Sequence, residues 1–113
     1  MSVPFACDLT AIPPEDRARH RELTRYLVTE AAEAIDETGK GLVLRFSSDE
    51  LEAVAEFLGY ERRCCPFVDF SLRVPSGQQS VLLELSGPEG VTEFLRAELG
   101  LGGTGSDNRA QPQ

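Results

Sequence analysis

The sequence predicts an α+β fold in a single domain, with a four-stranded antiparallel sheet of two hairpins and three helices packed on it. An apolar run at 42–46 and two stretches with apolar residues at every second position, 68–74 and 81–85, indicate strands. Stretches with helical spacing of apolar residues stand before, between and after these runs, which gives the order (β)αββαββα. The chain has 113 residues, enough for one hydrophobic core.

The first segment leads into a helix. Residues 3–9 are short, apolar and β-leaning, and contain Cys7. The following run, Thr10 to Asp16, combines two prolines with two acidic residues, which is typical of a helix start. Apolar and aromatic side chains then recur at helical spacing, namely at His20, Leu23, Tyr26 and Leu27.

The end of this helix is ambiguous in the sequence. Alanine and glutamate favour continuation of the helix to about residue 35. Residues 28–36 also fit a strand that leads through the turn 38–41 into the clear strand 42–46, which would make a hairpin.

The second helix begins at a predicted capping box, with Ser47 as the cap and Glu50 three residues later. Its expected apolar face also carries Glu61. The helix is expected to stop before Pro66, which has no N–H to donate and disfavours helical angles at Cys65. The residues expected on that face are Leu51, Val54, Ala55, Leu58 and Cys65.

The second hairpin spans residues 67–86, with turn chemistry at 75–78. A last helix is predicted to start at Gly87-Pro88-Glu89, with the proline at its first position, and to end at Gly100. Residues 1–100 are therefore predicted to form the domain, and the polar, Gly-rich residues 101–113 to form a disordered tail.

Composition limits the function. The net charge is −8, so a nucleic-acid partner, which needs clustered Lys and Arg, is not expected. No apolar run reaches the length of a membrane span, and the start of the chain lacks the pattern of a signal peptide. We therefore expect an acidic cytoplasmic protein whose thiols are free by default.

The cysteines carry the strongest chemical signal. Cys64 and Cys65 are adjacent at the predicted helix end, and a third cysteine, Cys7, lies near the N-terminus. Converging thiolates select soft ions such as Hg(II), Cu(I), Zn(II), Cd(II) or As(III). The predicted metal ligands are these three cysteines, and no organic cofactor is expected. His20 could in principle complete a set of four, but a site of three thiolates fits the count better.

Glu61 precedes the cysteine pair by three and four residues, so on a helix its carboxylate lies over both sulfurs. Arg62 and Arg63 would lower the pKa of the thiols, whereas the negative end of the helix dipole would raise it. The sequence leaves the sign of the net shift open.

The favoured function is a module that binds a soft metal ion, or a thiol-reactive small molecule, for sensing, buffering or delivery. One alternative is a thiol-dependent enzyme in which Cys64 or Cys65 acts beside an acid, Glu61 or Asp69, for example in cleaving an organometal. Another is a redox or interaction protein, with a vicinal disulfide between Cys64 and Cys65 or with the sheet as the face of a homodimer.

Three segments resemble a known family: Cys7-Asp8-Leu9-Thr10, Pro13-Pro14-Glu15, and Glu61 through Cys64-Cys65-Pro66-Phe67 to Phe70. They are similar to a small three-cysteine domain that occurs alone and as the C-terminal part of some regulators of the mercury-resistance type. The resemblance covers residues 5–100 and implies binding of heavy metals or thiol-reactive compounds at Cys7, Cys64, Cys65 and Glu61. No helix-turn-helix precedes Cys7, so a stand-alone module without direct DNA binding is expected. The resemblance also favours a hairpin over a longer first helix.

Overall fold

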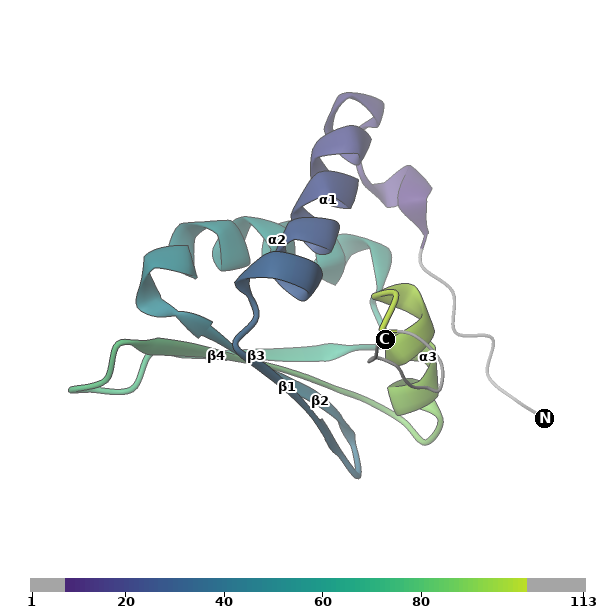
Figure 1. Ribbon diagram of the computed structural model, residues 1–113. Helices are drawn as coiled ribbons and strands as arrows, with labels where there is room; N and C mark the ends of the chain where they lie inside the picture. Colours follow the sequence, from purple (N-terminus) through teal and green to yellow (C-terminus); the bar gives the residue numbers. More distant parts are fainter. Residues whose placement is uncertain (1–7, 102–113) are drawn as a thin grey trace.

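A computed structural model describes residues 8–101. It confirms the predicted α+β fold, with three α-helices and one four-stranded antiparallel sheet (Figure 1). Single helical turns stand beside the main elements, at Leu9–Ala11, Leu27–Ala31 and Ser48–Glu50. The main elements are α1 (Pro14–Tyr26), β1 (Ala34–Thr38), β2 (Gly41–Ser47), α2 (Leu51–Cys64), β3 (Asp69–Arg73), β4 (Ser80–Ser86) and α3 (Val91–Glu98).

Both predicted hairpins form. β1 pairs with β2 and β3 pairs with β4, and antiparallel pairing of β2 with β4 joins the hairpins into a sheet with the order β1-β2-β4-β3. From Leu42 onward in β2 and throughout β4, buried residues alternate with more exposed ones, as a sheet covered on one face requires. The buried set is Leu42, Leu44, Phe46, Val81, Leu83 and Leu85.

The helices cover the sheet in two levels. In Figure 1, α2 lies above the sheet, α1 stands across α2 on the side away from the sheet, and α3 lies at the end of the sheet where α2 ends. The ring of Phe67, just after α2, meets the ring of Phe94 on α3 at a centroid distance of 5.2 Å. The C-terminal end of α2 is therefore enclosed by α1, the sheet and α3.

The segment 28–36, for which the sequence allowed either helix or strand, is helical in its first part and a strand in its last part. Helical structure continues from α1 through the π-helical turn Leu27–Ala31, and residues 32–33 connect it to the sheet, so the expectation of a strand from residue 28 is wrong for residues 28–33. The strand β1 begins only at Ala34. Burial of Leu27 against the core, at 1% exposure, keeps the chain helical for one more turn before it turns into the sheet.

The expected strand near the N-terminus is not present in its described part. Asp8 caps a 3-10 turn at Leu9–Ala11, with its carboxylate accepting a hydrogen bond of 3.0 Å from the Thr10 N–H. The Asp8 N–H donates to the carbonyl of Cys64 over 2.8 Å, which fixes this segment to the end of α2. Residues 3–7, with Cys7, and almost all of the predicted tail lie outside the described residues.

The start of α2 differs from a capping box. Ser47 caps as predicted, since its hydroxyl accepts a hydrogen bond from the Asp49 N–H. Glu50 does not return the bond, because its carboxylate accepts from the hydroxyl of Tyr26 on α1 at 2.7 Å. The buried face is also rotated from the expected one. Phe57 is buried and Ala55 is exposed, because α2 packs against α1 as well as against the sheet.

The last helix starts later than predicted. Pro88 does not open α3; its carbonyl accepts a hydrogen bond from the N–H of Val91, the first helical residue. Between them Gly90 has a φ of 93°, a left-handed conformation that strongly favours glycine. The predicted apolar face is confirmed by the burial of Val91, Leu95 and Leu99. No helix within residues 8–101 is long and apolar enough to cross a membrane.

Candidate metal centre

Two of the predicted site residues lie on one face of α2. Glu61 and Cys64 are three residues apart in its last turns, and both are buried, at 1% and 0% exposure. The helix ends as Pro66 requires: the N–H of Cys65 makes the last helical bond, to the carbonyl of Glu61, over 2.8 Å. The helix thus brings a carboxylate and a thiol into the enclosed end of the core.

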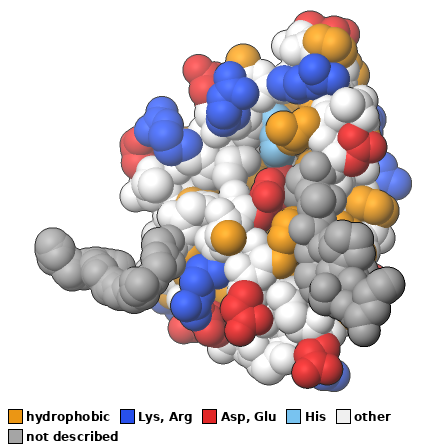
Figure 2. Space-filling view, turned by 90° about the vertical axis from the view of Figure 1, so that its right-hand side faces the viewer, with side chains coloured by type: hydrophobic (Ala, Val, Ile, Leu, Met, Phe, Trp, Pro, Cys, Tyr) orange, Lys and Arg blue, Asp and Glu red, His pale blue; other side chains and the backbone are white. Residues whose placement is uncertain are grey.

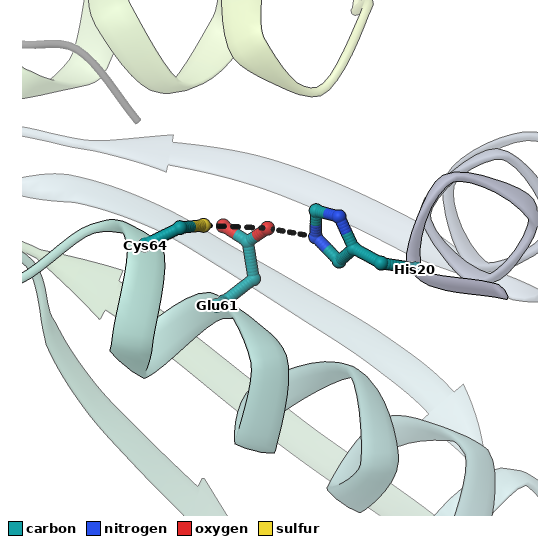
Figure 3. A group of neighbouring side chains, drawn as sticks. All are labelled: His20, Glu61 and Cys64. Atoms are coloured by element: carbon teal, nitrogen blue, oxygen red, sulfur yellow. Dashed lines mark hydrogen bonds and ion pairs between the residues drawn. The ribbon is translucent and has the colours of Figure 1, made fainter. Parts of the chain in front are cut away.

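The carboxylate of Glu61 lies between a sulfur and an imidazole (Figure 3). Its Oε2 is 2.6 Å from Nε2 of His20 and 3.9 Å from Sγ of Cys64. One ligand atom from each of His20, Glu61 and Cys64 lies within 4.8 Å of the other two. Imidazole, carboxylate and thiolate are the three side-chain ligand types that zinc uses, and ligands on one tetrahedral ion lie about 3.3–3.8 Å apart. The His20–Glu61 distance of 2.6 Å is that of a hydrogen bond and is shorter than this spacing, so the two side chains would have to move apart to share an ion with Cys64.

His20 reaches the cluster from α1. It lies on the buried side of that helix with Leu23, and its side chain is only 8% exposed. Its ring is stacked on Phe57 at a centroid distance of 6.2 Å and meets the edge of Tyr60 at 5.7 Å. Both rings belong to α2, so the crossing of α1 over α2 fixes the orientation of the imidazole toward Glu61.

The structure confirms that Glu61 overhangs both cysteines of the pair. Cys65 Sγ lies 3.6 Å from Glu61 Oε1, and the two sulfurs are 3.7 Å apart. Cys65 is disulfide-bonded and Cys64 carries a free thiol. The thiol of this pair that is available to an ion is therefore that of Cys64. Cys7, the third predicted ligand, lies outside the described residues.

The sign of the Cys64 pKa shift, which the sequence left open, is upward. Burial is the main cause, and the negative charges of Glu61 and Glu98 add to it, so the pKa of the thiol rises to about 12. Arg62 and Arg63 are exposed on α2 and are not among the causes of the shift. Without a bound cation the thiol is therefore fully protonated at neutral pH.

A pocket opens beside the cluster. It has a volume of about 440 Å³ and lies between α1 and the C-terminal end of α3, with His20 and Glu98 among its lining residues. Figure 2 shows the histidine at the bottom of a hollow, below a group of Lys and Arg side chains. Burial and the nearby charge of Glu61 raise the pKa of Glu98, while His20 lowers it. His20 thus connects the surface pocket with the buried carboxylate and thiol.

Sequence reasoning found part of this cluster. It placed Glu61 and Cys64 together from their helical spacing, and the structure brings them together. It considered His20 as a ligand and set it aside, because nothing local in the sequence shows which residue of α2 a histidine on α1 will meet. The place of His20 beside Leu23 and Leu27 on one helical stripe was the available signal of its burial. Glu98 was not recognised.

Comparisons with models of protein families, with curated proteins and with solved structures give no significant match.

Proposed function

We propose that this protein binds a soft or borderline divalent metal ion, with His20 Nε2, a carboxylate oxygen of Glu61 and Cys64 Sγ as ligands. The observation that carries this proposal is the convergence of three different donor atoms, from two helices, within 4.8 Å in a buried site. Burying a carboxylate is unfavourable unless it is paired or coordinates a metal. His20 is the partner of Glu61 in the metal-free protein, and a bound ion would take over that role.

Charge balance favours a divalent ion. When metal is bound, the imidazole is neutral, whereas the carboxylate of Glu61 and the thiolate of Cys64 carry one negative charge each. A divalent cation makes the buried site neutral, but Cu(I) would leave it negative and As(III) would leave it positive. The thiolate adds a preference for soft ions. Zn(II), Cd(II) and Hg(II) are therefore preferred over Cu(I) and As(III).

Three ligands leave one position of a tetrahedral ion for an exogenous ligand, unlike the closed four-ligand sites that zinc uses to hold folds together. That supports sensing, buffering or delivery of the ion over a permanent structural role. The resemblance of the segments around the cysteines to a domain of mercury-resistance-type regulators points to the same class of ions.

The enzyme alternative receives less support in its metal-free form. A cysteine nucleophile needs a lowered pKa, and such cysteines lie in electropositive surroundings. Cys64 lies instead beside Glu61, and its pKa is raised to about 12. Only a bound cation would turn this thiol into a thiolate near neutral pH.

The direct test is titration of the metal-free full-length chain with Cd(II), followed by thiolate-to-metal charge-transfer absorbance and by calorimetry. We expect one ion per chain. Loss of second-shell groups alone typically weakens metal binding by about 10–100-fold, so Glu61→Gln and Cys64→Ala should weaken it by at least about 100-fold. Glu56→Gln, the same substitution at a half-exposed position of α2, is the matched control and should bind normally.

Unchanged Cd(II) affinity in both Glu61→Gln and Cys64→Ala would disprove this site. The wider cysteine set is tested separately with Cys7→Ser and with the double variant Cys64→Ser/Cys65→Ser. If the double variant binds as tightly as the wild type, the cysteine pair has no part in binding.

A further inference from the structure

The pocket between α1 and the end of α3 has the dimensions of a small-molecule site. Its volume of about 440 Å³ falls in the range of about 300–1,000 Å³ that such sites occupy. Leu9, Ala97 and Leu99 provide apolar lining, and Leu9 is a large hydrophobic side chain that is 49% exposed. A ligand with an apolar body would cover this surface.

The α1 side of the pocket is cationic. Arg17, Arg21 and Arg25 follow one another at intervals of four residues, so they lie along one side of the helix. Glu98 is an acidic residue in the lining of the pocket, opposite these arginines. Three arginines around one hollow are unusual in a chain with a net charge of −8, and they favour an anionic ligand.

The arginines differ in their present contacts. The Nε of Arg17 donates to the carbonyls of Leu9 and Ile12, each over 3.0 Å, which holds its guanidinium at the pocket. Arg25 forms an ion pair with Glu30. Arg21 has no hydrogen-bond or ion-pair partner within residues 8–101. Its guanidinium can therefore meet a carboxylate with two parallel hydrogen bonds.

His20 supplies an independent sign of a ligand. Its side chain is 8% exposed and lines the pocket, and its Nε2 is occupied by Glu61. Its Nδ1 makes no hydrogen bond to any residue in the range 8–101, although buried polar atoms are nearly always partnered. A molecule in the pocket is the natural partner of this nitrogen.

We propose that this pocket binds a small organic acid, with its carboxylate at Arg21 and its apolar body against Leu9 and Leu99. The anion site stands independently of the metal, and its coupling to the metal rests on the proposed function. A metal ion on Nε2 of His20 leaves the ring proton on Nδ1, which then donates a hydrogen bond, as the second nitrogen of a metal-bound histidine usually does. Without the metal, the ring nitrogen that carries the proton depends on the tautomer. Metal binding should therefore strengthen binding of the acid, and the acid should strengthen metal binding by the same factor.

The probe is 4-phenylbutyrate, titrated into the ¹⁵N-labelled, metal-free full-length chain and followed by amide chemical shifts. We expect saturable shifts at residues 17–29 and 97–100, and none with 4-phenylbutylamine, which has the same apolar body and the opposite charge. Arg21→Gln should weaken binding by about tenfold, a modest loss for a charge-assisted pair. Arg73→Gln, at an exposed position of β3 outside the pocket, is the matched control and should bind normally.

Absence of saturable shifts, equal binding of the amine, or an equal loss in Arg73→Gln would each overturn the anion site. The titration is then repeated with the protein saturated by Cd(II). Tighter binding of the acid supports the coupling, and unchanged affinity overturns it. If Cd(II) does not bind while the acid still does, the metal proposal fails and the anion site stands.

Discussion

Two polar contacts join α1 to α2, and they differ in their surroundings. Arg19 and Glu56 meet over 3.0 Å at the surface, with side chains 52% and 37% exposed. The neighbouring His20 meets Glu61 over 2.6 Å in the core, with side chains 8% and 1% exposed. The same two helices therefore carry an ion pair in water and a contact of the same kind in the interior.

The difference shows which of the two contacts needs a reason other than stability. An exposed pair is screened by solvent and contributes little, but it also costs little to keep. A buried pair loses hydration, and replacement of both partners by apolar residues of similar volume is often neutral or stabilising. Packing alone therefore does not require His20 and Glu61, whereas the proposed metal centre with Cys64 would.

The largest expected effect comes from removal of one partner of the buried contact. His20→Leu leaves the carboxylate of Glu61 in the core without its imidazole, and we expect a loss of about 3–5 kcal/mol in the free energy of unfolding of the metal-free protein. Urea denaturation measures this loss. His20→Gln keeps a donor within reach of Glu61 and should lose clearly less; equal losses in both variants would show that the hydrogen bond is irrelevant.

Replacement of both partners tests whether the buried contact between His20 and Glu61 is needed for stability. We expect His20→Leu with Glu61→Met to recover most of the stability lost in His20→Leu, and to lie within about 1 kcal/mol of the wild type or above it. The same variant should no longer bind Cd(II). A double variant as unstable as the single one would show that the buried contact is needed for folding and not only for binding.

The pH dependence of stability tests the raised pKa of the Cys64 thiol. The pKa of its thiol is about 12 in the folded protein against an ordinary value of 9.0, so below about pH 9 the thiol is protonated in both states and has no effect. Between about pH 9 and pH 12 only the unfolded state ionises, and the metal-free protein should lose stability as the pH rises. In Cys64→Ala this decline should be shallower, since its remaining part comes from groups such as Tyr26 and Tyr60, whose pKa values are also raised. Parallel curves for the two proteins would contradict the assignment.

The smallest effect is expected at the surface contact. Arg19→Ala, Glu56→Ala and the double variant form a cycle in which the coupling between the two side chains should be barely measurable by urea denaturation, and smaller still at high salt. A coupling comparable to the loss in His20→Leu would show that the exposed pair, not the buried one, holds α1 against α2.

The fold could be predicted because its signals are local. An apolar run at 42–46 and alternation at 68–74 and 81–85 define the strands, and proline, serine and glycine mark the ends of the helices. Errors occurred where tertiary contacts compete with these signals. The chain stays helical through Ala31 while Leu27 is buried, and Glu50 bonds to Tyr26 on another helix instead of capping its own.

By itself, the sequence determined that Glu61 would lie over Cys64 and Cys65, because a helix ended by Pro66 fixes residues three and four apart on one face. The positions of His20 and Glu98 beside these residues follow only from the tertiary structure. The crossing of α1 over α2 brings His20 to Glu61, and α3 brings Glu98 close enough to raise the pKa of Cys64. The physical reason is that helical spacing is set by the backbone over a few residues. Burial and the meeting of separate helices depend instead on how all the apolar faces pack at once.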